Sequence, residues 1–204
     1  MSWTPPELAG GQVHGPYFSA DDLYTAAREV LVGVVPHSED RQLCLSSLYG
    51  HSGHRLSEPT VDHLDGSSKI AFDQALDDVI VGNGCGVFRA RHLMTVPTPH
   101  QLDHVLTRME RYAQAPSLEV RAYQAPLSIP TFAPLIFANT ETFLALEDDR
   151  YYGVGSGLHI SGRATARWAT AYFDRLWADA PFTLRTPVGV NAEAVHALRH
   201  SLGK

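Results

Sequence analysis

The chain has 204 residues, of which 44% are apolar and 19% charged, a composition typical of a globular domain with one hydrophobic core. Its net charge of −6, without any run of Lys and Arg, predicts no direct contact with nucleic acid and no attraction to an anionic membrane. Two cysteines are too few for a disulfide framework, and no apolar run approaches the roughly 20 residues that cross a bilayer. These features predict a cytoplasmic protein that does not span a membrane.

The N-terminal part of the chain predicts an irregular segment, then a helix, then a strand. Residues 1–17 contain three prolines and three glycines and predict an irregular arm, with 18–204 forming a single α/β domain. Ser19 is a good N-cap, and the two aspartates after it favour a helix that runs to about Glu29. The β-branched run Val30–Val35, closed by a proline, predicts a central strand that is covered on both faces.

The middle of the chain alternates helical and extended patterns. Arg41–Tyr49 predicts a short helix, and the polar, turn-rich segment Gly50–Gly66 predicts a loop. Apolar residues at helical spacing predict a helix over residues 68–81. Gly86–Met94 predicts a strand. A helix from Thr98 to about Ala115 follows, because Thr caps, Pro occupies the first helical position and Gln reaches back as in a capping box.

The second half of the chain predicts a run of short strands followed by a strongly amphipathic helix, Arg163–Ala180. The predicted strands are Glu119–Tyr123, Pro134–Phe137, Phe143–Glu147 and Leu158–Ser161. Asn191 is expected to cap a last short helix that ends at about His200. The strands are joined too closely for helical crossovers, so the predicted fold class is α/β, with a mixed central sheet flanked by helices.

Several segments of the chain together resemble phospholipase-D-like domains, over roughly residues 25–180. They are RMERYAQAPSLEVRAYQAP, APLIFANTETFLALED, GLHIS and ARWATAYFDRLWADA, with the helix and strand that precede them. More narrowly, the chain is similar to the degenerate versions attached to helix-turn-helix regulators in actinobacteria. The resemblance implies one half of a phospholipase-D-like architecture.

Active members of that superfamily resemble one another in a His-x-Lys-x4-Asp motif that is followed by a Gly-Ser-x-Asn turn. The corresponding strand of this chain has Phe132 at the histidine position, Pro134 at the lysine position and Asn139 at the aspartate position. Gly155-Ser156 preserves the start of the second piece, but Leu158 replaces its asparagine. The resemblance therefore implies a fold and a pocket position without phosphodiester chemistry.

Candidate binding residues lie on or beside the predicted strands, because ligand sites in such sheets gather where strands meet loops. They are His37, Arg89, His92, Arg121, Tyr123, Tyr151 and His159. The loop histidines His51, His54 and His63 are candidate metal ligands, with a solvated polar loop as the alternative. The sequence identifies no cofactor.

These observations favour a non-catalytic domain that senses a small ligand or mediates dimerisation in a bacterial regulatory system. Its partner would be a second copy of the chain or a partner regulator. One alternative is a small-molecule metabolic enzyme, in which the histidine-rich loop supplies a metal or a general base. The other is a protein-interaction adaptor that uses the Trp168–Trp177 face of the amphipathic helix.

Overall fold

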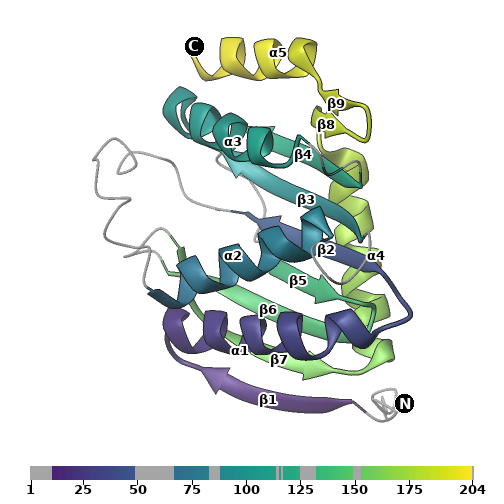
Figure 1. Ribbon diagram of the computed structural model, residues 1–204. Coiled ribbons are helices and arrows are strands. Elements are labelled where there is room, and N and C mark those ends of the chain that lie inside the picture. Colours follow the sequence, from purple (N-terminus) through teal and green to yellow (C-terminus); the bar gives the residue numbers. More distant parts are fainter. Residues whose placement is uncertain are drawn as a thin grey trace, which may run out of the picture.

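In the part of the chain that the structure describes, nine extended segments pair into one mixed sheet, shown in the computed structural model in Figure 1. The structure describes residues 11–48, 67–82, 88–113, 115, 117–124, 132–148 and 153–203. The strands are β1 (Gln12–Tyr17), β2 (Gln42–Ser47), β3 (Arg89–Val96), β4 (Leu118–Gln124), β5 (Ala133–Phe137), β6 (Glu141–Asp148), β7 (Gly153–Ser161), β8 (Phe182–Thr186) and β9 (Gly189–Val190). The helices are α1 (Ala20–Gly33), α2 (Ser67–Val81), α3 (Pro99–Arg111), α4 (Arg163–Asp179) and α5 (Ala192–Leu202), with a 3-10 turn η1 (Val35–His37).

The sheet combines a parallel centre with antiparallel flanks, in the order β1-β7-β6-β5-β2-β3-β4-β8-β9. Strands β2, β3 and β4 are parallel, and α2 and α3 lie between them in the chain, as parallel connections require. Strands β5, β6 and β7 form an antiparallel meander beside β2. The predicted mixed sheet flanked by helices is confirmed.

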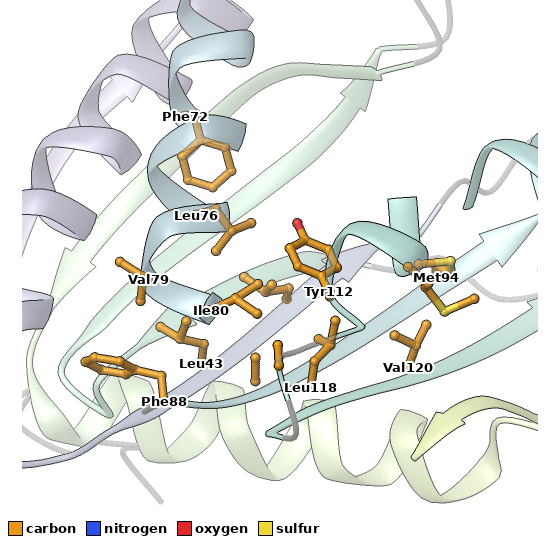
Figure 2. Packing of buried hydrophobic residues seen from close by; sticks show 14 of the residues in the cluster. Leu43, Phe72, Leu76, Val79, Ile80, Phe88, Met94, Tyr112, Leu118 and Val120 are labelled. Atoms are coloured by element: carbon orange, nitrogen blue, oxygen red, sulfur yellow. The ribbon is translucent and has the colours of Figure 1, made fainter. Parts of the chain in front are cut away.

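Helices cover both faces of the sheet and divide the core into two clusters. In Figure 1, α1, α2 and α3 lie over one face and α4 crosses the other. Figure 2 shows Phe72, Leu76, Val79 and Ile80 of α2 pointing toward the sheet. The smaller cluster lies under α4 and includes Phe173, Leu176 and Trp177. Trp177 is therefore a core residue, whereas Trp168 is 55% exposed.

Three helices begin at the caps expected from the sequence. The side-chain oxygens of Ser19, Thr98 and Asn191 accept hydrogen bonds from backbone N–H groups three residues further on. The helix expected over 68–81 and the helix expected over Arg163–Ala180 are also present as α2 and α4. Local periodicity and capping chemistry were sufficient for these elements because both are short-range signals.

The predicted central strand Val30–Val35 is wrong. Helix α1 continues to Gly33 and is followed by η1. Leu23, Ala27 and Leu31 recur every four residues and are all buried, so the helical face that packs in the core extends through the β-branched run. Tertiary burial of this stripe outweighs the strand propensity of the valines.

The predicted short helix Arg41–Tyr49 is also wrong, because Gln42–Ser47 is strand β2 at the centre of the sheet. Four consecutive residues of β2, from Leu43 to Ser46, are buried. Leu43 and Leu45 belong to the cluster beneath α2, whereas Cys44 belongs to the cluster beneath α4. A strand that is covered on both faces lacks the alternation that would have identified it.

The segment 1–17, expected to be an irregular arm, contains strand β1, which pairs with β7 and forms one edge of the sheet. Five of its six residues are exposed, so it lacked an apolar pattern to identify it. Strands β8 and β9 lie between the helix expected at Arg163–Ala180 and the cap expected at Asn191, where the sequence analysis predicted no element. The expected loop Gly50–Gly66, and with it His51, His54 and His63, lies outside the described residues.

Candidate functional site

A cavity of about 250 Å³ lies between the helices α1, α2 and α3 and one face of the sheet. Its apolar lining includes Leu23 of α1, Phe72 of α2, Leu45 of β2 and Val105 of α3. The carboxyl ends of the parallel strands β2 and β3 border it through Ser47 and further residues. This end of a parallel sheet is where α/β proteins generally place ligands.

The first polar group of the cavity wall is a serine–histidine pair. The Ser47 hydroxyl oxygen and His92 Nε2 lie 3.0 Å apart, on neighbouring parallel strands. Burial, together with the positive charge of Arg108, lowers the pKa of His92 to about 3. The imidazole is therefore neutral at physiological pH and offers one donor and one acceptor nitrogen.

The second polar group joins α2 to α3 across the cavity. Arg108 Nη2 donates to Asp73 at 2.9 Å, its Nε donates to the Tyr112 hydroxyl at 3.3 Å, and Tyr112 donates to Asp77. Lys69 adds a second cation beside Asp73, at 2.9 Å. Figure 2 shows the Tyr112 side chain standing on the helix side of the sheet, with its hydroxyl turned toward α2.

The charges of this network stabilise one another. Burial alone would raise the pKa of Asp73, but the attraction of Arg108 and Lys69 outweighs it, so that the pKa lies below its ordinary value. Burial raises the pKa of Tyr112 to about 12, and its hydrogen bond to Asp77 acts in the same direction. The cavity therefore presents an ionised carboxylate, a guanidinium and a protonated phenol on otherwise apolar walls.

This arrangement is suited to holding a small molecule through one polar end while apolar walls enclose the rest. It is poorly suited to activating Ser47 as a nucleophile. A histidine with a pKa of about 3 is a weak base, and within the described residues no carboxylate hydrogen-bonds to His92. The chemistry that the site supports is recognition.

Among the strand-end candidates that the structure describes, only His92 lines this cavity. Arg89 and His37 lie toward the opposite ends of the parallel strands. Arg121 and Tyr123 lie on the other face of β4, where they donate to the carbonyl oxygens of Trp177 and Leu176, at 2.8 and 2.5 Å. They fix the end of α4 to the sheet.

His159 lies on β7, away from the cavity. Its Nε2 atom is 2.7 Å from a carboxylate oxygen of Glu141 on β6, and its ring stacks between Phe143 and His14. The side chain is only 7% exposed and joins three neighbouring strands. Tyr151 lies outside the described residues.

Asp73, Arg108, Tyr112 and Ser47 were missed by the sequence analysis. The available signal was the presence of charged residues beside the apolar stripes of two helices, with Lys69, Asp73 and Asp77 spaced one turn apart. Such residues are usually solvated. Nothing in the sequence says that the two helices face each other.

Metal binding receives no support from the described part of the chain, where no group of three or more His, Cys, Asp or Glu side chains is placed to hold a metal ion. The histidines His51, His54 and His63 lie outside the described residues.

None of the described helices has the length and apolarity of a membrane span.

The positions that correspond to the phospholipase-D motif lie on β5 and in the turn after it. Pro134 is buried, and its carbonyl oxygen accepts a hydrogen bond from the Ser46 hydroxyl at 2.5 Å. Phe132 is 47% exposed beside the start of β5. Asn139 adopts a φ of 52° and donates to Asp40. The side chains of Phe132 and Pro134 have no group that can transfer a proton or attack phosphorus.

No protein-family model matches the chain, and no curated protein sequence matches it. Among solved structures, it is similar to NucT from Helicobacter pylori, with a TM-score of 0.50 and 9% identity, over 83% of this chain and 98% of that one. The chain is also similar to Nuc from Salmonella typhimurium, a phospholipase D family member, with a TM-score of 0.45 and 10% identity, over 83% of this chain and 96% of that one.

TrmBL2, an archaeal chromatin protein, gives a TM-score of 0.47 and 20% identity, over 83% of this chain and 53% of that one. The present chain thus spans about half the length of TrmBL2. TrmBL2 binds DNA, and this finding overturns our expectation that net charge excludes direct contact with nucleic acid. Net charge does not describe how charge is distributed over a surface, so it cannot support that exclusion.

The described elements and the similarity to NucT agree on the architecture. Both the parallel centre and the antiparallel meander belong to one sheet with helices on its two faces. The chain therefore has a mixed α/β fold similar to that of NucT.

Proposed function

We propose that this chain is a non-catalytic ligand-sensing domain of a bacterial regulatory system. The observation that carries the proposal is the cavity of about 250 Å³, with apolar walls and two separate polar groups. Its volume lies just below the range of about 300–1,000 Å³ typical of sites for drug-sized ligands, so its ligand is a small metabolite. The neutral Ser47–His92 pair and the charged Asp73–Arg108 pair would fix the orientation of that ligand.

The absence of a catalytic role rests on the residues at two places. The positions of the phospholipase-D motif hold Phe132 and Pro134, and the serine beside the cavity is paired with a histidine that stays neutral. A binding site without an activated nucleophile favours sensing over turnover.

Sensing requires that the bound ligand change the equilibrium between two conformations. The cavity is lined by three helices and by the sheet, so a ligand in it would contact elements that can move relative to one another. A ligand bridging Asp73 of α2 and Arg108 of α3 would alter the contacts that join these helices. We expect the two helices to transmit the signal.

Native mass spectrometry of the purified protein, followed by thermal unfolding with a panel of small metabolites, tests the proposal. A ligand at about 100 times its Kd should stabilise the domain by about 2.7 kcal/mol. Val105→Phe, which places a larger ring in the cavity, should abolish this stabilisation. Leu106→Phe is the matched control, because Leu106 is the next residue of the same helix and does not line the cavity.

Two results would contradict ligand sensing through this cavity. One is equal stabilisation of both variants and the wild-type protein by the same metabolite. The other is a stoichiometric transition metal in the native mass spectrum, together with turnover of a panel member, which would favour the metabolic enzyme.

A dimerisation role is supported by a separate observation on the outer face of α4. Trp168 is 55% exposed, stacks on Tyr172 with ring centroids 6.3 Å apart, and is accompanied by Phe132, which is 47% exposed. The Tyr172 hydroxyl accepts a hydrogen bond from the backbone N–H of Phe132. Sedimentation equilibrium should show concentration-dependent association that Trp168→Glu abolishes, and a monomeric wild-type protein would refute this role.

A further inference from the structure

A second hollow, of about 930 Å³, lies at the opposite end of the parallel strands, where the chain begins β2 and β3. Four arginines line it, namely Arg41, Arg89, Arg163 and Arg167. Neither the proposed ligand cavity nor the family motif uses these arginines. Four of the 14 arginines of an acidic chain are thus gathered around one concave surface.

Backbone hydrogen bonds bring the four segments of this hollow together. The Arg89 N–H donates to the Arg41 carbonyl at 2.7 Å, which places the starts of β3 and β2 side by side. The Gly162 N–H donates to the Thr140 carbonyl at 2.6 Å, which fixes the start of α4 beside the β5–β6 turn. The Ala138 N–H donates to the Gln42 carbonyl at 2.9 Å, so the backbone positions from which the arginines extend are set by the framework of the sheet.

The arginines from the strands are held in place by their neighbours. The Arg41 guanidinium lies 5.4 Å from the centre of the Phe88 ring, and Arg89 donates to Glu119 at 3.2 Å. By contrast, Arg163 and Arg167 are exposed and have no carboxylate partner among the described residues. They lie one turn apart on α4, so their positive charges face the same side.

Three carboxylates also border the hollow, namely Glu39, Asp40 and Asp174. Asp174 accepts from Arg91 at 2.7 Å, and Asp40 accepts from the Asn139 side chain. Glu39 is exposed at the rim. The four arginines of the lining thus outnumber its three carboxylates, although the whole chain carries −6.

The start of α4 increases this positive potential. Its first turn contains no acidic residue, and Gly162 provides no side-chain cap for the free N–H groups. Arg163 then places a cation at the positive end of the helix dipole, which is unfavourable unless an anion lies nearby. From the four arginines and this uncapped helix start we infer that the hollow binds a phosphate group.

A phosphate group fits this chemistry because guanidinium groups donate to its oxygens in pairs and remain charged at all relevant pH values. The volume of the hollow leaves room around the phosphate for the rest of a ligand. That phosphate belongs either to a phosphorylated small molecule or to a nucleic-acid backbone. The two sources share the contact with Arg163 and Arg167 and are separated by experiment.

Isothermal titration of the full chain with inorganic pyrophosphate, at about 50 mM salt to limit screening, measures the shared contact. The double substitution Arg163→Ala and Arg167→Ala should weaken binding by about tenfold or more. Arg175→Ala is the matched control, because Arg175 is exposed on the same helix and does not line the hollow. Val105→Phe should leave pyrophosphate binding unchanged, which separates this site from the ligand cavity.

Fluorescence anisotropy with a short labelled DNA duplex identifies the source of the phosphate. A duplex that binds, is displaced by pyrophosphate and loses affinity in the double variant supports a nucleic-acid backbone. Pyrophosphate binding without duplex binding supports a phosphorylated small molecule. Failure of the wild-type protein to bind either probe, or equal binding by the double variant, overturns the inference.

Discussion

The charged network between α2 and α3 makes a quantitative prediction for Arg108→Met. Methionine keeps the apolar stem but removes three interactions, at 2.9 Å to Asp73, 3.3 Å to the Tyr112 hydroxyl and 3.6 Å to Asp77. A hydrogen bond to a charged group contributes about 1.5–3 kcal/mol, and partial exposure reduces this value. The arginine and the two carboxylate side chains are 27–30% exposed.

We therefore expect Arg108→Met to lower the free energy of unfolding at neutral pH by roughly 2–3 kcal/mol. For a chain of this length, that loss corresponds to a fall in Tm of about 4–12 °C. Urea unfolding followed by circular dichroism measures the difference. Arg111→Met is the matched control, since Arg111 lies on the same helix and is exposed.

The effect of Arg108→Met should also depend on pH in a defined direction. The folded-state pKa of Asp73 lies below its ordinary value of 3.8, so its ion pair stabilises the fold above that pH. This contribution is lost as the pH falls through the lower, folded-state pKa. The difference between wild type and variant should thus be largest near neutral pH and smaller in acid. A loss equal to that of Arg111→Met, or one that does not change with pH, would refute the reasoning.

Three further predictions concern single positions. Gly157→Ala should lower the free energy of unfolding measured in urea, because the new Cβ would lie 2.7 Å from the Leu144 carbonyl oxygen. Gly33→Ala is the control: its Cβ would meet no atom within 4 Å, so it should be neutral or slightly stabilising. The ¹⁵N shifts of His92 should show a neutral imidazole down to about pH 4, because burial and the nearby guanidinium lower its pKa to about 3; protonation near pH 6 would contradict this. In a Cys85→Ser background, Cys44 should resist a thiol reagent in the folded protein and react on unfolding, because it is buried and burial raises the pKa of its thiol. Fast labelling of Cys44 in the native protein would be the opposite result.

The candidate site shows how far sequence reasoning extends for this chain. Of the described strand-end candidates only His92 lines the cavity, and Arg121 and Tyr123 lie on the opposite face of β4. Alternation along β4 was visible, but the side that faces the cavity was not, because it depends on where α3 and α4 pack. The Asp73–Arg108 contact joins residues 35 positions apart and has no local signature.

The sequence by itself determined the elements whose signals are local. Helices α2, α3, α4 and α5 follow from apolar spacing and from caps such as Thr98 and Asn191, and the meander β5–β7 follows from strands joined by short turns. That Phe132 and Pro134 have no side-chain group that can transfer a proton was equally visible, since it requires only residue identities.

Tertiary structure decided the elements whose local preference was outweighed by burial, namely the helical run through Val30–Gly33 and the central strand β2. It also decided both concave sites. The ligand cavity and the arginine hollow each gather residues from at least three segments that lie far apart in the chain. Propensity and periodicity act over a few residues. The packing of helices on a sheet instead decides which distant side chains come into contact, and both concave sites consist of such side chains.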